Sequence, residues 1–246
     1  MVASFHTAPR SSSTYASPIC PASRLVQTQR VSVLIVDDQP QVCQGLHTLL
    51  EFYSRGSSIQ FSIAGEASTY ADALKLAADQ PTLILLNLEL KAQENSIAMM
   101  RRLREFYQGK VLVLSEHRED DLVFQAMQAG ASGYIVKERM AAQLCIAISV
   151  ILANQVYLTS EGMTQFFRSF RSHYDQAALT EQKIHLSDRE REVLSLLVEG
   201  EPNARIAEQL YITVATVKAH LTSIFEKLGV KNRSQAIVTA LKLNLV

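Results

Sequence analysis

The chain contains 246 residues, of which 48% are hydrophobic, and its 24 basic side chains balance 24 acidic ones. Because an ordinary domain has about 100–200 residues, this length predicts two globular domains. The most apolar stretch, residues 144–153, is about half as long as the roughly 20 residues that a membrane span needs, which argues against a membrane protein. A net charge of zero gives no sign of nucleic-acid binding, so such a function must rest on where the basic side chains lie.

Three cysteines, Cys20, Cys43 and Cys145, stand far apart in the sequence. Their odd number and wide spacing fit neither a zinc site nor a disulfide framework. We interpret them as ordinary thiols of a protein in the reducing cytoplasm, with a redox-sensing thiol as the alternative.

Residues 1–30 are rich in Ser, Thr, Ala and Pro and show no apolar periodicity, which predicts a disordered leader. The leader contains Arg10, Arg24 and Arg30 but no acidic residue. This composition also resembles that of organelle transit peptides, so an organelle is the alternative to the cytoplasm.

Residues 31–153 alternate short apolar runs with amphipathic helical patterns. The expected strands cover residues 31–36, 61–66, 83–88, 111–114 and 134–136, and the expected helices cover residues 40–53, 70–78, 97–106, 120–129 and 141–153. Five strand-helix units predict an α/β, doubly wound domain, a five-stranded parallel sheet with helices on both faces. The looser pattern of residues 154–185 predicts a linker with a short helix near residues 161–171.

Residues 186–246 have purely helical periodicity and predict an all-α domain of four helices. Ser187 and Glu190 form a capping-box pattern at the start of the first helix. The later boundary signals are Gly200 and Pro202 after the first helix, a second helix over residues 204–210, Thr213 before the third helix, Gly229 after it, and Ser234 at the start of the fourth.

The third of these helices has one face suited to packing and one suited to contacts with DNA. Its apolar residues Val217, Leu221, Ile224 and Leu228 recur at helical spacing and are expected to point inward. Lys218, Ala219 and Thr222 then point outward. A short helix, a turn and a helix that carries lysine and threonine form the arrangement that enters a major groove of double-stranded DNA.

The sequences LSDREREVLSLLVEG and IAEQLYITVATVKAHLTSIFEKLGVKNRSQAI closely resemble the carboxyl-terminal domain of NarL/FixJ (LuxR-type) regulators. The resemblance implies that the third helix reads bases and that the last helix supports dimerisation. It makes Lys218, Ala219 and Thr222 candidates for base contacts; the candidates for phosphate contacts are Thr216, His220, Lys227, Lys231 and Arg233. The alternative interpretation is a solvated helix face, and the chain departs from the family in the turn at Glu201 and Pro202.

Asp37 and Asp38 follow the first predicted strand, at the edge where open parallel sheets place ligands, and adjacent acids there suggest a metal. The segments VLIVDDQP and AMQAGASGYIVKE resemble the receiver domain (flavodoxin-like, as in CheY) of two-component response regulators, over about residues 32–153. The resemblance implies that Ser115 engages a phosphoryl group, that Lys137 is its charged partner and that Tyr134 is an aromatic switch. The alternative is that these three residues are retained only for the fold.

Asn87 stands after LILL, where the family has its phospho-accepting aspartate, and Lys91 and Asn95 also depart from the family pattern. A carboxamide cannot form an acyl phosphate, so we expect a pseudo-receiver that works without aspartyl phosphorylation. We expect no metal site, with at most weak Mg²⁺ binding at Asp37 and Asp38. Glu89 could supply the missing acid, although a side chain at that offset need not point into the site, and deamidation of Asn87 is a further alternative.

These observations favour a DNA-binding transcriptional regulator of response-regulator type that needs no cofactor, is not an enzyme, and forms a homodimer at least on DNA. The alternative is an interaction protein whose receiver captures a histidine kinase or another regulator, with DNA binding secondary. An enzyme built on Asp37 and Asp38 with a metal has little support, since no nucleophile or base accompanies them at a recognisable spacing.

Overall fold

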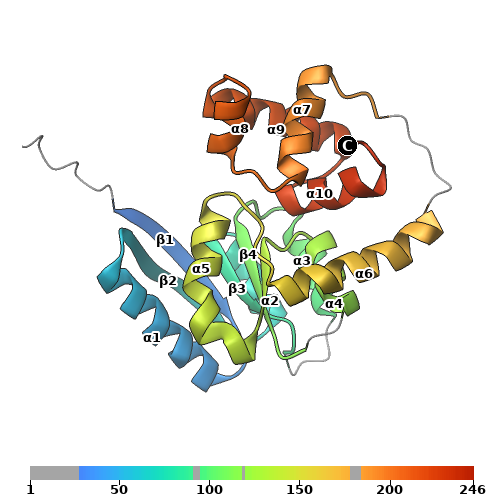
Figure 1. Cartoon of the computed structure of the whole chain (residues 1–246). Coiled ribbons are helices and arrows are strands. Elements are labelled where there is room, and N and C mark those ends of the chain that lie inside the picture. Colours follow the sequence, from blue (N-terminus) through green and yellow to red (C-terminus); the bar gives the residue numbers. More distant parts are fainter. Residues whose placement is uncertain (1–27, 91–94, 118–119, 178–183) are drawn as a thin grey trace, which may run out of the picture.

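The computed structural model describes residues 28–90, 95–117, 120–177 and 184–246. It shows an α/β part and an all-helical part, which lie against one another (Figure 1). Most of the predicted leader, and with it the transit-peptide alternative, lies outside the described residues. Within those ranges, none of the helices has the length and apolar character needed to cross a membrane.

The α/β part contains the predicted parallel sheet, with the strand order β2-β1-β3-β4-β5. Its strands are β1 (Gln29–Val36), β2 (Ile59–Ala67), β3 (Leu83–Asn87), β4 (Lys110–Ser115) and β5 (Gly133–Val136). The central β3 is buried along its whole length, as expected of a strand with both faces covered, whereas the edge strand β2 alternates between exposed and partly buried residues. The first strand begins two residues earlier than predicted, because Gln29 donates its amide hydrogen to the Ser58 carbonyl.

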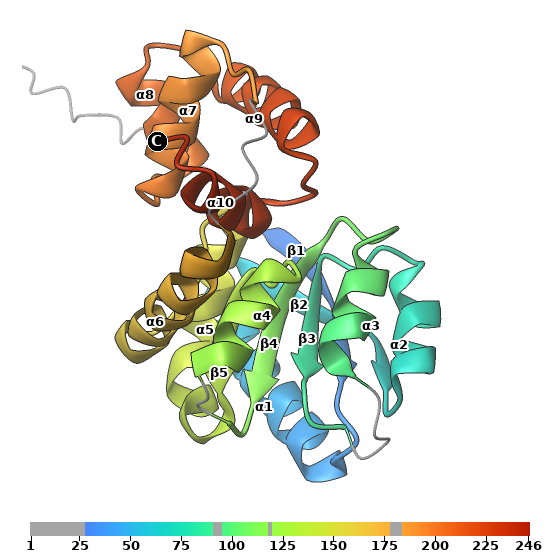
Figure 2. The same cartoon turned by 90° about the vertical axis from the view of Figure 1, so that its right-hand side faces the viewer.

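Helices cover both faces of the sheet and form two apolar cores (Figure 2). One core includes α1 (Pro40–Gly56) and α5 (Met140–Leu152); the other includes α2 (Tyr70–Ala77), α3 (Ser96–Leu103) and α4 (Asp120–Gln128). A single 3₁₀ turn, η1 (Lys137–Arg139), precedes α5. This arrangement confirms the predicted fold class.

The segment predicted as a linker contains a long helix, α6 (Ser160–Ala177), which packs along α4. The ring of Phe124 lies 5.6 Å from that of Phe166 and 6.4 Å from that of Phe170, and Phe166 is part of the receiver core. The two phenylalanines of α6 are four residues apart and pack on the same ring, and the helix is longer than the predicted span of residues 161–171. The predicted domain limits at residues 153 and 186 stay predictions.

The all-helical part consists of α7 (Asp188–Val198), α8 (Asn203–Gln209), α9 (Val214–Leu228) and α10 (Arg233–Lys242) around a third apolar core. Both hydrogen bonds of the Ser187 capping box are present, and Thr213 caps α9 as predicted. Gly229 ends α9 with φ of 65°, a left-handed conformation that glycine adopts without strain. The fourth helix is capped by Asn232 instead of beginning at Ser234.

Helix α10 joins the two parts of the molecule because it lies against α4 and the turn that follows it (Figures 1 and 2). The buried Ser234 hydroxyl donates to the Ala131 carbonyl at 2.5 Å, and the Lys242 ammonium lies 5.4 Å from the centre of the Phe124 ring. Val238 is counted within the receiver core. The helix expected to support dimerisation is therefore engaged within one chain in this structure.

Candidate nucleic-acid interface and receiver pocket

Helix α9 presents the two faces that its sequence predicts. The Thr213 hydroxyl accepts the amide hydrogen of Thr216 at 3.1 Å, which satisfies one of the free amides of the first turn. Four apolar side chains are buried in the third core and anchor the helix, namely Val217, Leu221, Ile224 and Leu228. Lys218, Ala219 and Thr222 are all exposed, and the Thr222 hydroxyl donates to the Lys218 carbonyl at 3.0 Å, which leaves its oxygen free to accept.

The outward face of α9 borders the receiver in this arrangement. Lys218 and Thr222 line a pocket of about 370 Å³ whose opposite wall includes Lys110 at the start of β4. We call it the basic interdomain pocket, and define it by the cations Lys110, Lys218, Lys231 and Arg233 that line it. Two of the three candidate base contacts thus share a pocket with a receiver side chain.

The five candidate phosphate contacts fall into two groups. Thr216 and His220 are partly exposed on α9, and Lys231 is exposed, with its ammonium donating to the Glu105 carbonyl of the receiver at 3.3 Å. The Lys227 ammonium lies 2.6 Å from the carboxylate of Glu190. The hydrogen bonds from Lys227, Ser223 and the Ser187 backbone lower the pKa of Glu190 to about 2, so this carboxylate engages Lys227 at all ordinary pH values.

Arg233 is held by contacts within the helical part of the molecule. It is buried at the start of α10, and one guanidinium nitrogen donates to the Leu197 and Glu201 carbonyls at 3.0 and 2.9 Å. Burial lowers the pKa of Arg233 to about 10. Arg233 therefore joins α10 to the end of α7, because a cation among apolar helices satisfies its donors with nearby carbonyls. Arg233 and Lys227 are thus held by partners within the chain, and their phosphate contacts stay predictions.

The predicted receiver pocket assembles at the carboxyl edge of the sheet, where Asp37 is buried after β1. One Asp37 oxygen lies 2.9 Å from the Lys137 ammonium, and the other accepts the amide hydrogen of Gln39 at 2.9 Å. Lys137 is also 3.8 Å from the carboxylate of Glu116. Asp37 is therefore already neutralised by a side chain of this chain.

Asn87 is fully buried at the end of β3, and its side chain shapes the loop that follows. Its amide oxygen accepts the backbone hydrogen of Glu89 at 3.1 Å, and its amide nitrogen donates to the Glu89 carbonyl at 3.4 Å. A carboxamide can make both bonds because it has a donor and an acceptor. An aspartate at this position could make only the first.

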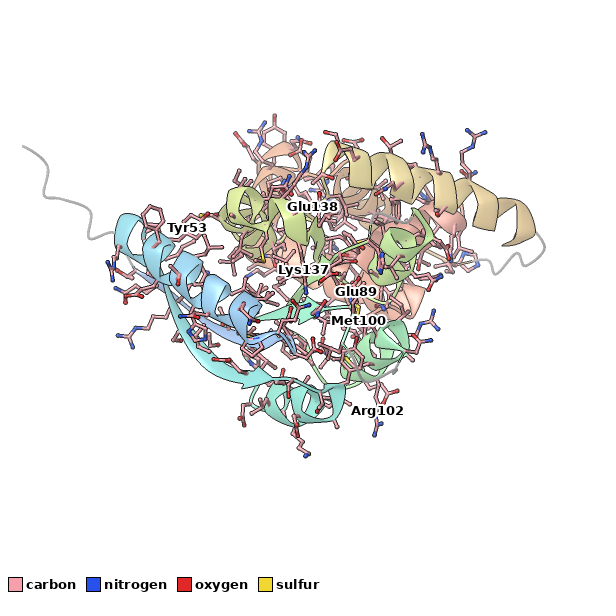
Figure 3. All side chains as sticks on the ribbon, turned by 90° about the horizontal axis from the view of Figure 1, so that it is seen from below. Tyr53, Glu89, Met100, Arg102, Lys137 and Glu138 are labelled. Carbon is pink, nitrogen blue, oxygen red and sulfur yellow. The ribbon has the colours of Figure 1, made fainter. Side chains whose placement is uncertain are left out.

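Glu89 points into the pocket, where the sequence interpretation doubted that it would. One oxygen of its carboxylate accepts the Ser115 hydroxyl hydrogen, and the other accepts the Glu116 amide hydrogen at 3.1 Å. Figure 3, which views the molecule from below, shows Glu89 and Lys137 near each other. The chain bends at Leu88, and the hydrogen bonds of the Asn87 side chain to the Glu89 backbone fix this turn.

The predicted switch residue Tyr134 is buried and connects to the same group of contacts. Its hydroxyl donates to the His117 carbonyl at 3.0 Å, and the His117 amide donates to the Ser115 hydroxyl at 3.1 Å. The structure therefore brings all six predicted pocket residues to one edge of the sheet and adds Glu89. The loop after β4 is held by the Glu89 carboxylate through Ser115 and Glu116.

The pocket residues do not form a metal-binding cluster. In the parts of the chain that the structure describes, no three or more His, Cys, Asp or Glu side chains gather in a way that could hold a metal ion. The Lys137 ammonium on Asp37 supplies the positive charge that a cation would otherwise provide. Weak Mg²⁺ binding at Asp37 and Asp38 stays a prediction.

The described cysteines, Cys43 and Cys145, are both free. Burial, followed by the charge of Asp37, raises the pKa of Cys43, and burial raises that of Cys145. Both thiols stay protonated near neutral pH and therefore lack the thiolate that reactive cysteines use. Cys20 lies outside the described residues.

Comparisons with known proteins match both parts of the molecule. Residues 33–149 match the family described as response regulator receiver domain, and residues 185–240 match the bacterial regulatory proteins of the luxR family. The transcriptional regulatory protein LiaR of Bacillus subtilis is 34% identical over 217 residues, which cover 88% of this chain and 99% of that protein. The oxygen regulatory protein NreC of Staphylococcus aureus is 29% identical over 219 residues, with the same two coverages.

A solved structure supports the fold assignment. The RcsB response regulator of Salmonella typhimurium is 19% identical, with a TM-score of 0.52, and the match covers 85% of this chain and 97% of that chain. The two matched families occur in the same order as the two parts of the structure, and the likeness to LiaR extends over nearly all of that protein. The chain belongs to the response regulators of the luxR family, which are DNA-binding transcriptional regulators and not enzymes.

Proposed function

We propose that this regulator binds double-stranded DNA through Lys218, Ala219 and Thr222 of α9, and that its receiver works without aspartyl phosphorylation. One observation carries the second part of the proposal: the Glu89 carboxylate already accepts hydrogen bonds from the Ser115 hydroxyl and the Glu116 amide. The receiver therefore contains a permanent anion next to the hydroxyl that its relatives are expected to use for a phosphoryl group.

Two features of the pocket support phosphate independence. The residue at the expected acceptor position is Asn87, whose carboxamide is not a nucleophile that could form an acyl phosphate. The donors that would stabilise an added phosphoryl group are already used by Glu89, and Lys137 is paired with Asp37. An incoming phosphoryl group would have to displace contacts between charged groups, which are stronger than neutral hydrogen bonds.

Treatment of the full-length protein with acetyl phosphate and Mg²⁺ tests this proposal. We expect no gain of a phosphoryl group by intact-mass measurement, and the same DNA affinity with and without treatment at one stated salt concentration. A phosphoryl group mapped to an aspartate of the receiver, accompanied by tighter DNA binding, would contradict the proposal. Intact mass also tests whether Asn87 is deamidated.

The DNA-binding face is tested with Lys218→Ala and Thr222→Ala, using genomic fragments as probes. Each change should weaken specific binding by about 1–3 kcal/mol, since a good base contact has about that value. Lys75→Ala is the matched control, because Lys75 is an exposed lysine paired with Asp72 on the receiver. Wild-type affinity in both α9 variants would refute this assignment, and would favour an interaction protein that captures a kinase or another regulator.

We further propose that Thr216, His220 and Lys231 contact DNA phosphates, which positions α9 without reading sequence. Binding to DNA as a homodimer would need the two parts of the chain to separate, because α10 lies on α4 in the present arrangement. The free thiols of Cys43 and Cys145 fit the reducing cytoplasm as the place of action.

A further inference from the structure

The basic interdomain pocket carries positive charge that nothing in the described structure neutralises. Its four cations come from both parts of the molecule: Lys110 from β4, Lys218 from α9, Lys231 from the turn before α10, and Arg233 from α10 itself. No acidic side chain lines it, and none of the four is paired with a carboxylate among the described residues. Cations on facing surfaces repel one another, so this juxtaposition opposes the very contact that forms the pocket.

The pocket also contains polar groups that are buried without hydrogen-bond partners. Arg233 is only 9% exposed, and its Nε and one terminal nitrogen, Nη1, make no hydrogen bond; the Asn232 amide nitrogen beside it makes none either. Burying donors without acceptors is unfavourable, and the penalty is largest for charged groups. The protein therefore satisfies the Arg233 guanidinium only in part, through the Leu197 and Glu201 carbonyls.

The electrostatic state of Lys110 agrees with this picture. Its ammonium donates to the Asn154 side chain at 2.8 Å. Burial, followed by the charges of Arg104 and Arg233, lowers the pKa of Lys110 to about 8. Because neighbouring cations contribute to this lowered pKa, Lys110 lies in a region of positive electrostatic potential. A bound anion would reduce that potential.

We propose that the basic interdomain pocket binds a small phosphorylated metabolite, and that the bound anion holds the receiver and the DNA-binding helices in the arrangement seen here. Arginine and lysine donors together suit phosphate oxygens, because the guanidinium binds two of them side by side. The volume of about 370 Å³ lies within the usual range of small-molecule sites, about 300–1,000 Å³. The ligand is therefore larger than a single phosphate ion.

The proposed ligand would compete with DNA, which makes this inference rest on the assignment of α9 under the proposed function. Lys218 and Thr222 line the pocket and are also the candidate base contacts, so the anion and DNA cannot use them together. Because Lys110 lies on the receiver, the complete site exists only when the two parts are in contact. A ligand that binds one arrangement only shifts the population toward it.

Calorimetric titration of the full-length protein with inorganic pyrophosphate, at constant ionic strength and without Mg²⁺, tests the site. We expect saturable binding that becomes roughly tenfold weaker in Lys110→Gln, because a charged hydrogen bond is lost. Lys75→Gln is the matched control and should bind as the wild type does. Asn154→Asp is a second test: it places a carboxylate beside Lys110 and should also weaken binding, with little change to a left-handed position (φ 62°).

Competition on DNA completes the test. Pyrophosphate should weaken DNA binding by the wild type and much less by Lys110→Gln, when each protein is compared with itself in the absence of pyrophosphate. No pyrophosphate binding, or binding that Lys110→Gln and Asn154→Asp leave unchanged, would overturn the inference. Neither result would contradict the proposed DNA-binding function. That function is contradicted if the Lys218 and Thr222 variants keep full DNA affinity in the absence of any anion.

Discussion

The two edges of the receiver sheet handle charge in opposite ways. At the carboxyl edge, Asp37 is paired with Lys137, and Glu89 accepts two hydrogen bonds from the loop after β4. At the amino edge, Lys110 and Arg233 meet across the contact between the two parts of the chain with no carboxylate between them. The edge that receivers are expected to use for signalling thus gathers carboxylates around the single cation Lys137, whereas no acidic side chain lines the pocket at the edge facing the DNA-binding helices.

This contrast indicates which edge of the sheet we expect to respond to a ligand. A pocket that already holds several carboxylates gains little from an added phosphoryl group, because the new group repels them and must displace existing partners. A pocket with surplus positive charge gains much from an anion, because the anion removes repulsion between the cations. We therefore expect perturbations of the carboxyl edge to change stability, and perturbations of the amino edge to change ligand and DNA binding.

The largest effect is expected when the carboxyl edge loses its central anion. Asp37→Ala leaves the Lys137 ammonium, only 10% exposed, without its main partner, and breaking a buried pair in this way costs about 3–5 kcal/mol. Urea unfolding followed by circular dichroism measures the loss. The double variant with Lys137→Met should recover part of it; equal destabilisation by the single and double changes would show that the pair is not the cause.

A smaller destabilisation is expected when the built-in anion is removed. Glu89→Gln keeps the shape of the side chain but loses the charge that accepts from Ser115 and Glu116. Such a charged hydrogen-bond group contributes about 1.5–3 kcal/mol to the free energy of unfolding. Glu51→Gln is the control, because Glu51 is exposed on α1 and paired only with Arg55. If Glu89→Gln and Glu51→Gln have the same free energy of unfolding, Glu89 does not stabilise the loop after β4.

Restoring the expected acceptor should also disturb the completed edge. Asn87→Asp adds a carboxylate to a pocket that already holds Asp37 and Glu89, and removes the donor to the Glu89 carbonyl. Two like charges about 4 Å apart cost up to roughly 4 kcal/mol at an effective dielectric constant near 20, with less expected where solvent screens them. The variant should melt earlier in metal-free buffer and be stabilised by Mg²⁺. A melting temperature equal to that of the wild type, both in metal-free buffer and with Mg²⁺, would contradict this prediction.

The last prediction concerns the amino edge and the dependence of stability on pH. The pKa of Lys110 is lowered to about 8 from an ordinary value of 10.5, so the unfolded chain binds more protons than the folded one between these values. The contribution of Lys110 to stability should therefore rise with pH across that window. Comparison with Lys110→Met isolates this contribution, since other groups titrate in both proteins. If the free energy of unfolding changes with pH in the same way in the wild type and in Lys110→Met, Lys110 makes no such contribution.

The sequence was sufficient for the elements and for most of the site. Strand and helix periodicities predicted the parallel sheet and the four carboxyl-terminal helices, and the capping residues Ser187, Thr213 and Gly229 lie where expected. These are local signals, since a cap or an apolar stripe depends on residues a few positions apart. The outward positions of Lys218, Ala219 and Thr222 follow from the same spacing.

Other features depended on residues that are distant in the sequence. The role of α6 was underestimated because the packing of Phe166 and Phe170 on Phe124 cannot be read from local pattern. Arg233 is a candidate phosphate contact by the family resemblance, which could not show that its side chain is buried against the end of α7. Burial of this kind depends on how helices pack, which no single segment specifies.

The amino-acid sequence by itself determined the order of the elements, the helix that we propose faces DNA, and the lack of an aspartate at position 87, because each depends on neighbouring residues. Only the tertiary structure decided that Glu89 reaches Ser115, that α10 lies on α4, and that Lys110 faces Arg233. The physical reason is that charge pairing and burial act through space, so the partners of a side chain are chosen when the cores of the two parts come together.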